Sequence, residues 1–333
     1  MLDLYGTLGP ACSDVETLTA MFEAGMTGLR LNLSHVTLPQ AAPQFDAVHE
    51  AARRCGKRAQ LLIDMQGPEL RIGALTEPLR LDEGEKLTIG KGGLPVPAQV
   101  MPHLLPGQKL LLDDGKLLLE ILESHRGFSW ARVLRGGLLQ SRKSLALPGS
   151  HLHPPTMTEL DKQNISLARQ YGVTAIMQPF VRDRSDLDAV RQSLRDFGCE
   201  DIRLFAKIEN LEGVANLEEL IPACDEIVIA RGDLGNAMPL WELPRVQKEI
   251  AAKCRARGRA FMVVTQMLAS MEHSPVPTRA EVSDIFNAVC DGAISVMVTG
   301  ETAIGKYPVE VIRYLANTAA EAEAYRESMG QTT

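Results

Sequence analysis

Charged residues close two apolar runs in the middle of the 333-residue sequence. Lys207 and Glu209 end the first run, and Arg231 and Asp233 end the second. Alternate residues of a strand point to the same face, so the spacing of two predicts that each pair projects together. Buried charges are costly unless they are paired or bind a ligand. The pairs therefore predict a site for a divalent metal ion and an anionic substrate.

Each residue type favours a particular chemistry. Glu209 and Asp233 offer the hard oxygen ligands that suit Mg²⁺ or Mn²⁺. Lys207 beside them could stabilise a transferring phosphoryl group by its charge. Arg30 and Arg71 offer bidentate recognition of phosphate.

Other apolar runs also end in polar residues. Arg30, Asn32 and Ser34 alternate with leucines in one run, Asp64 ends the next, and Thr265 follows a later one. Asn32, Ser34 and Asp64 provide oxygen atoms suited to a monovalent cation or a second metal. Because several runs end in this way, we expect their polar ends to meet at one mouth.

These side chains require an element order that brings the run ends together. Eight short apolar runs alternate with stretches of helical period, which favours a parallel sheet covered by helices. The expected strands are about Leu2–Leu8, Gly28–Leu33, Gln60–Met65, Thr174–Phe180, Ile202–Ile208, Glu226–Ala230, Phe261–Met267 and Ala293–Thr299. The clearest expected helices are Val15–Ala24 after a Ser13 cap, Met157–Tyr171 with a Thr156–Glu159 capping box, Leu240–Arg257, Arg279–Val289 and Pro308–Tyr325.

Eight strand–helix units are the number that closes a (β/α)8 TIM barrel, whose active sites lie at the carboxyl ends of the strands. A doubly wound open sheet is the alternative, but the sequence lacks the glycine-rich dinucleotide turn of that fold. We therefore predict an α/β protein with an eight-stranded parallel barrel.

One region interrupts this rhythm. Residues 68–148 contain short β-type runs and turn signals, including the hairpin dipeptide Asp114-Gly115. We predict a small inserted β-barrel-like lid domain there, and a barrel domain of residues 1–67 and 149–333.

Composition excludes several classes of protein. The net charge of −7 argues against broad nucleic-acid binding, and no apolar run is long enough to span a membrane. The six cysteines form no C-x-x-C pair, so we expect neither a zinc site nor a disulfide framework. The beginning of the sequence shows no secretory signal, and we expect a cytoplasmic protein.

Longer motifs resemble the pyruvate kinase family. The runs TLGPA, AGMTGLRLNLSH, IDMQGPELR, AKIENLEGV, IVIARGDLG, TQMLASM, PTRAEVSDIFNAV and TGETAIGKYP occur in the family's order across almost the whole chain. The resemblance implies an eight-stranded barrel with an inserted β-rich lid. It also implies transfer of a phosphoryl group from phosphoenolpyruvate to ADP, giving pyruvate and ATP.

The resemblance also implies roles for individual residues. Lys207 would stabilise the phosphoryl group in transit, Arg30 would contact the phosphate, and Thr265 would organise protonation of the enolate. Glu209 and Asp233 would bind Mg²⁺ or Mn²⁺. The residues implied to hold K⁺ are Asn32, Ser34, Asp64 and the backbone oxygen of Met65. Those on the nucleotide side are Asn32, His35, Arg71 and Lys143. Those at the substrate carboxylate are Ala230, Arg231, Gly232 and Asp233, with Arg231 shaping the pocket.

The sequence departs from the family pattern in two places. Met65-Gln66 replaces the family's Thr-Lys, which puts nucleotide or metal affinity in question. The family's C-terminal allosteric domain has no counterpart in the sequence. We therefore expect no activation by sugar phosphates, and a monomer or homodimer rather than a tetramer.

Two alternatives to a pyruvate kinase remain open. A divergent metal-dependent aldolase or decarboxylase of the same barrel could use Glu209 and Asp233 on pyruvate-like acids. A non-catalytic pyruvate kinase paralogue is the second alternative, although the presence of Lys207 and Thr265 counts against it.

Overall fold

The computed structural model describes residues 2–34, 36–113, 115–150, 152 and 154–330. The chain divides into two compact units. The first comprises Met1–Gly67, Thr156–Gly235 and Leu240–Thr333, and the second comprises Pro68–Pro155 and Asn236–Pro239. That the second unit acts as a lid stays a prediction.

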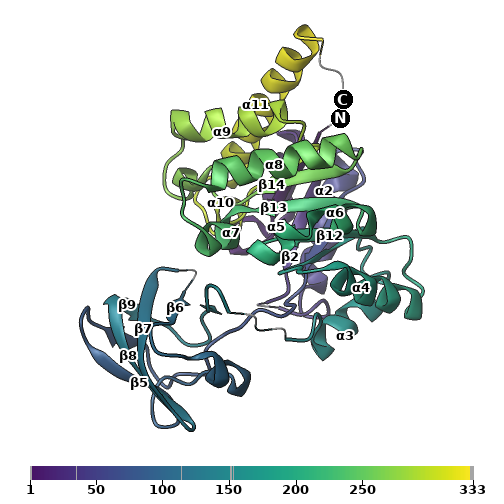
Figure 1. The fold of residues 1–333 in the computed structure, drawn as a ribbon. Helices are drawn as coiled ribbons and strands as arrows, with labels where there is room; N and C mark the ends of the chain where they lie inside the picture. Colours follow the sequence, from purple (N-terminus) through teal and green to yellow (C-terminus); the bar gives the residue numbers. More distant parts are fainter. Residues whose placement is uncertain (1, 35, 114, 151, 153, 331–333) are drawn as a thin grey trace. The chain divides into compact units, whose positions relative to one another are not determined.

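The first unit is built around a closed barrel of eight parallel strands, in the order β1-β15-β14-β13-β12-β11-β3-β2. Figure 1 labels four of these strands, with the neighbours β12, β13 and β14 side by side. The strands are β1 (Asp3–Thr7), β2 (Gly28–Asn32), β3 (Gln60–Asp64), β11 (Ala175–Gln178), β12 (Arg203–Ile208), β13 (Glu226–Ala230), β14 (Ala260–Val264) and β15 (Ser295–Met297). The predicted (β/α)8 barrel is confirmed, and each expected strand overlaps an observed one.

Helices follow the strands along the chain, and α8, for example, packs beside β13 and β14. They are α1 (Val15–Glu23), α2 (Ala42–Arg54), α3 (Glu159–Leu167), α4 (Arg184–Asp196), α5 (Leu211–Ala215), α6 (Leu217–Leu220), α7 (Arg231–Ala237), α8 (Leu243–Ala256), α9 (Arg279–Cys290), α10 (Gly300–Ala303) and α11 (Pro308–Ser328). Short 3₁₀ turns are η1 (Pro10–Cys12), η2 (Ala98–His103), η3 (Ile221–Ala223) and η4 (Ala269–Glu272).

The barrel interior is a packed hydrophobic core. Its members come from alternate positions of the strands, as the period of two requires. They are Tyr5, Leu62, Ala175, Met177, Phe205, Val228, Ala230, Met262, Val264 and Met297. On three of the strands the next alternate position toward the carboxyl end is polar: Thr7 after Tyr5, Asp64 after Leu62 and Lys207 after Phe205. The chemistry-bearing residues therefore form the layer directly above this core.

The second unit consists of β-strands around its own core. Its strands are β4 (Leu79–Leu81), β5 (Lys86–Gly90), β6 (Lys109–Leu112), β7 (Leu117–His125), β8 (Phe128–Arg135), β9 (Gly137–Leu139) and β10 (Leu145–Ala146). A five-stranded sheet has the order β10-β6-β7-β8-β5, and β4 pairs with β9. β6 and β7 form the predicted hairpin, in which Leu112 pairs with Leu117; Asp114 itself lies outside the described residues.

Several expected strand ends were placed too late. β14 ends at Val264 because Thr265 and Gln266 both have positive φ, at 76° and 54°, and β11 ends before Phe180 for the same reason. These left-handed conformations are not compatible with a continuing strand. Arg231 and Asp233 are not strand residues either, since β13 ends at Ala230 and α7 begins at Arg231. The expectation that they share one strand face was wrong.

Two helix caps also differ from expectation. Asp14 caps α1 in place of Ser13, because its carboxylate accepts from the backbone N–H of Thr17. Thr158 caps α3 in place of Thr156, and its partner in the capping box is Asp161. The expected box was therefore two residues too early. Helix α8 begins at Leu243, after the expected Leu240.

The Glu226 carboxyl lies at the opposite, amino end of the barrel and affects how stability depends on pH. Glu226 opens β13, is 2% exposed and accepts a hydrogen bond from the Ser295 hydroxyl. Burial raises the pKa of Glu226 to about 7, with the charge of Asp3 adding to the rise and that of Arg203 opposing it. The native protein therefore holds a proton on Glu226 that the unfolded chain has released by this pH.

We expect Glu226→Gln to flatten the pH dependence of stability. A native pKa above the unfolded value makes the free energy of unfolding decrease as pH rises from about 4.5 to 7, by on the order of 3 kcal/mol. Glutamine cannot ionise, so this contribution disappears. Urea unfolding at pH 5, 6, 7 and 8 measures it, and equal pH slopes for the two proteins would contradict the assignment.

Candidate active site

A buried cluster of two cations and two carboxylates lies at the carboxyl ends of β2, β3 and β12. The Lys207 ammonium lies 3.1 Å from Asp64 and 2.9 Å from Glu209. Arg30 donates two hydrogen bonds to Asp64 Oδ2, at 2.9 and 2.7 Å. The barrel thus brings together residues that are up to 179 positions apart, from Arg30 to Glu209.

Burial strengthens the interactions within this cluster. The side chains of Lys207 and Arg30 are each 12% exposed, and those of Asp64 and Glu209 are 3% and 2% exposed. Burial alone would lower the pKa of Lys207, but Asp64 and Glu209 raise it above its ordinary value. Burial would raise the pKa of Asp64, but Lys207 and Arg30 hold it below its ordinary value. Lys207 is therefore a fixed positive charge, not a free amine that could act as a nucleophile.

Glu209 follows β12 and is held by a backbone group from the neighbouring strand end. Its Oε2 accepts a hydrogen bond from the N–H of Phe180 at 2.8 Å. Phe180 itself has a φ of 51°, in the left-handed region, and lies two residues after the end of β11. Sequence reasoning missed the role of Phe180, because a backbone donor leaves no signature in side-chain type.

Asp233 lies in the first turn of α7, directly after β13. β12 and β13 are neighbours in the barrel, with Ile208 opposite Ile229. Two carboxylates at the ends of adjacent strands match the one or two protein ligands that Mg²⁺ usually takes, with waters or substrate oxygens completing the shell. Among the residues that the structure describes, no three His, Cys, Asp or Glu side chains gather as a metal group. Carboxylate oxygens suit Mg²⁺ or Mn²⁺, whereas a structural zinc site takes mainly Cys and His ligands.

Thr265 has the most constrained backbone of the predicted site residues. A β-branched residue at a φ of 76° is strained, and such strain persists only where neighbouring contacts impose it. Its hydroxyl donates to Val264 O at 2.6 Å and accepts from Gly232 N at 2.8 Å. Its carbonyl accepts from Arg231 at 2.6 Å. These bonds join the end of β14 to the start of α7.

Arg231 takes a structural position in this arrangement. Its guanidinium forms an ion pair of 2.6 Å with Asp284 of α9 and binds the Thr265 carbonyl. It therefore links three consecutive barrel segments and shapes the surroundings of Gly232. Because the Gly232 N–H already binds Thr265, it is not free for a substrate carboxylate in this arrangement.

The predicted K⁺ ligands come from two neighbouring strands. Asn32 lies opposite Asp64 in the register of β2 and β3, and its Oδ1 accepts from Ser34 N at 3.0 Å. Met65 follows Asp64 and is buried. His35, which was predicted for the nucleotide side, follows Ser34 in the sequence and lies outside the described residues.

The remaining predicted residues belong to the second unit. Arg71 forms an ion pair of 2.7 Å with Glu69, and Lys143 forms one of 2.8 Å with Asp113. Arg71 and Ser144 form an isolated β-bridge, which places Lys143 beside Arg71 in adjacent extended segments. Both cations thus lie on adjacent extended segments of their own unit, and each is paired with a different carboxylate.

Not every polar strand end enters the predicted mouth. Glu301 is buried and accepts from the backbone N–H groups of Thr299 and Leu268, at 2.6 and 3.1 Å. Thr302 exchanges hydrogen bonds with the backbone of Thr7. These residues connect loops to each other, so the expectation that all the polar strand ends serve one ligand was too broad.

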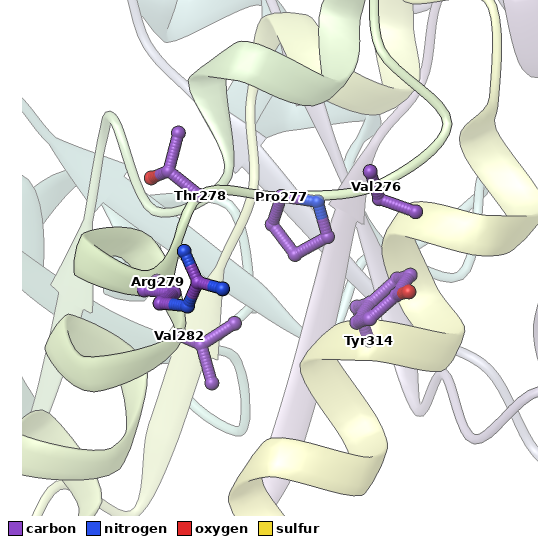
Figure 2. Close-up of a pocket in the computed structure, with 6 residues that line it drawn as sticks. All are labelled: Val276, Pro277, Thr278, Arg279, Val282 and Tyr314. Atoms are coloured by element: carbon purple, nitrogen blue, oxygen red, sulfur yellow. The ribbon is translucent and has the colours of Figure 1, made fainter.

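A hollow of about 220 Å³ lies elsewhere on the barrel unit, at the beginning of α9 (Figure 2). Its lining residues are Val276, Pro277, Thr278, Arg279, Val282 and Tyr314. None of the predicted site residues lines it. Its lining is mainly apolar and lacks the carboxylates of the charged cluster.

The fold and this charged cluster define a (β/α)8 barrel protein with a buried charged centre at the carboxyl ends of its strands. Residues 2–312 match the family described as "Pyruvate kinase, barrel domain". The chain therefore belongs to the pyruvate kinase family, and the resemblance seen in its motifs is confirmed.

Individual relatives agree with this assignment. The pyruvate kinase of Geobacillus stearothermophilus is 38% identical over 341 residues, which cover 98% of this chain and 58% of the relative. That of Aeropyrum pernix is 37% identical over 323 residues, covering 96% and 70%. That of Thermococcus litoralis is 36% identical over 336 residues, covering 98% and 70%. The chain thus spans between about 58% and 70% of the length of these relatives.

None of the described helices is long and apolar enough to cross a membrane.

We expect Thr265→Ala to destabilise the barrel unit, whereas Thr265→Ser should not. Alanine removes the acceptor of the Gly232 N–H and the donor to Val264, which costs about 1–3 kcal/mol for the partly buried groups left without partners. Serine keeps the hydroxyl and should lose less than about 1 kcal/mol. Urea unfolding of the two variants measures the difference, and equal losses would show that the hydroxyl bonds do not hold this turn.

Proposed function

We propose that the chain transfers the phosphoryl group of phosphoenolpyruvate to ADP, giving pyruvate and ATP. The observation that carries the proposal is the buried Lys207, held as a cation between Asp64 and Glu209 at the carboxyl end of the barrel. Phosphoryl transfer depends mainly on positioning and on charge placed around the moving group. Family membership supports the same reaction.

Lys207 and Arg30 supply the fixed positive charge. Their shared partner Asp64 holds both side chains in place before a ligand arrives, so little reorganisation is needed during the reaction. Arg30 would bind the phosphate of phosphoenolpyruvate, and Lys207 would stabilise the phosphoryl group as it leaves the enol oxygen. Because Lys207 remains protonated, it acts by charge and does not form a covalent intermediate.

Glu209 and Asp233 would hold Mg²⁺ or Mn²⁺. When bound, the ion would offset negative charge on the phosphoryl and enolate oxygens. A monovalent cation, K⁺, would take oxygen ligands from Asn32, Ser34, Asp64 and the Met65 backbone.

The segment 230–233 and Thr265 would bind and protonate the pyruvate part of the substrate. A substrate carboxylate would approach the backbone of Ala230, Arg231, Gly232 and Asp233, and the Gly232 N–H would then exchange its Thr265 partner for the ligand. The released Thr265 hydroxyl would position a water that delivers the proton to the enolate carbon.

The nucleotide side would use Arg71 and Lys143 of the second unit, together with Asn32 and His35. The guanidinium and the ammonium suit the phosphates of ADP. We further propose that the protein works in the cytoplasm as a monomer or homodimer, on small molecules and without nucleic acid or membrane partners.

A coupled assay tests the reaction directly. Phosphoenolpyruvate, ADP, Mg²⁺ and K⁺ are supplied at millimolar concentration, and pyruvate is detected with lactate dehydrogenase and NADH. We expect NADH oxidation that depends on both substrates. No pyruvate formation under these conditions would overturn the proposal, and pyruvate release from a hydroxy-keto acid without ADP would favour an aldolase.

The variant Lys207→Met tests the role assigned to the central cation. We expect phosphoryl transfer to fall by at least about 1000-fold, because the fixed charge is lost. Exchange of the pyruvate methyl protons with solvent should remain detectable by NMR, because Glu209, Asp233 and Thr265 remain.

Lys248→Met is the matched control, since Lys248 is an exposed lysine that pairs with Asp291 on the outside of the barrel. Its transfer rate should equal that of the unaltered protein. Removing a buried cation also destabilises the variant by roughly 3–5 kcal/mol, so folding is checked by circular dichroism. Equal loss of transfer and of methyl exchange in a folded Lys207→Met protein would contradict the role.

A further inference from the structure

A fully buried carboxylate outside the charged cluster holds the chain where it leaves the barrel unit. Asp161 is 0% exposed and stands at the third position of α3. Its Oδ1 accepts from Gln66 N at 2.9 Å, and its Oδ2 accepts from Gly67 N at 3.0 Å. The same Oδ2 accepts from the Thr158 N–H and hydroxyl, both at 2.8 Å.

These donors come from the two segments that connect the barrel unit to the second unit. Gln66 and Gly67 are the last residues before Pro68, where the second unit begins. Thr158 lies just after Thr156, where the chain returns to the barrel unit. One carboxylate therefore binds the outgoing and the returning segment at the same point.

The bonds suit a carboxylate and not an amide. All four donors are neutral N–H or O–H groups, and only a carboxylate offers two acceptor oxygens of this capacity. Asparagine would present an NH₂ group to one side and leave a buried backbone N–H without an acceptor.

Neighbouring residues restrict the same two segments further. Gly67 has a φ of 57°, and a Cβ at this position would meet Pro179 Cγ at 2.5 Å. The buried Gln178 donates through Nε2 to Thr156 O and to Pro179 O, both at 3.0 Å. The outgoing turn is thus packed against the end of β11, and the returning segment is bound to it.

We call the hydrogen bonds of Asp161 to Gln66, Gly67 and Thr158 the clasp. The clasp adjoins the charged cluster along the chain. Asp64, which binds Arg30 and Lys207, lies two residues before Gln66. We propose that Asp161 is a positioning residue, which fixes the end of β3 together with both connections to the second unit. Phosphoryl transfer needs Arg71 and Lys143 of that unit, so it depends on Asp161 more strongly than does proton exchange at pyruvate, which uses barrel residues alone. This inference rests on the proposed function.

Amide hydrogen exchange tests the clasp without any catalytic readout. In Asp161→Asn, the amides of Gln66 and Gly67 should exchange at least about tenfold faster, because their acceptor is weakened. The control is Glu159→Gln, which makes the same acid-to-amide change on α3 at an exposed side chain that pairs with Lys162 and leaves Asp161 bound to both amides. Exchange at Gln66 and Gly67 should be unchanged in this control. Unchanged exchange in Asp161→Asn, or equal acceleration in both variants, would overturn the proposal.

Activity then separates positioning from general destabilisation. In Asp161→Asn, kcat/KM for ADP should fall by at least about tenfold, while methyl-proton exchange of pyruvate stays within about threefold of the unaltered protein. A parallel fall of both activities would overturn the positioning role. Gly67→Ala disturbs the same turn, so it must also lower kcat/KM for ADP while methyl-proton exchange of pyruvate stays within about threefold. It replaces Asp161→Asn if that variant does not fold.

The amide-exchange and activity experiments distinguish this inference from the proposed function. If the unaltered protein transfers no phosphoryl group, the proposed function fails, while amide hydrogen exchange still decides whether Asp161 holds the two segments. If transfer is present but insensitive to Asp161→Asn, only the positioning role fails.

Discussion

The burial of Lys207 between Asp64 and Glu209 is the interaction on which the site depends. A lone buried ammonium would lose its proton, and two lone buried carboxylates would repel each other. Each group therefore lowers the free-energy cost of burying the charges of the others. Arg30 completes the balance by binding Asp64. The hydrophobic core of the barrel lies directly below these residues along the strands and keeps water from that side. A cluster of this kind stabilises the fold only modestly, and its clearest use is to hold charge ready for a charged ligand.

The barrel meets this requirement through its parallel strands. Arg30, Asp64 and Lys207 come from three different strands, and the parallel arrangement of the barrel places the carboxyl ends of these strands on one side. The turns after the strands then aim backbone groups at the same region. Phe180 donates to Glu209, and Thr265 connects the end of β14 to α7. Asp161 extends this support to the segment after β3. Phosphoryl transfer depends on positioning and on electrostatic stabilisation. In this barrel the charges lie above a packed core and are held by hydrogen-bonded loops.

Much of this could be predicted from the sequence. The spacing of Lys207 and Glu209 indicated a shared site, because alternate strand residues share a face. Short apolar runs between stretches of helical period located every barrel strand. Features set by backbone conformation could not be predicted. The positive φ of Thr265 and Phe180 ended two strands early, and Arg231 proved to begin a helix. Asp161 was missed because a single acidic residue within a helical stretch resembles any solvent-exposed one; only the fold shows that Gln66 and Gly67 meet it.

Binding of Mn²⁺ tests the central claim most directly, because it measures the charged cluster without the full reaction. Mn²⁺ is titrated into the protein and the free ion is followed by electron paramagnetic resonance, for the unaltered chain, Glu209→Gln and Asp233→Asn. The control is Glu281→Gln, which alters a carboxylate of the α9 capping box outside the cluster. The account predicts one site that weakens by at least about tenfold in the first two variants and is unchanged in the control. Equal Mn²⁺ affinity in all four proteins would contradict it.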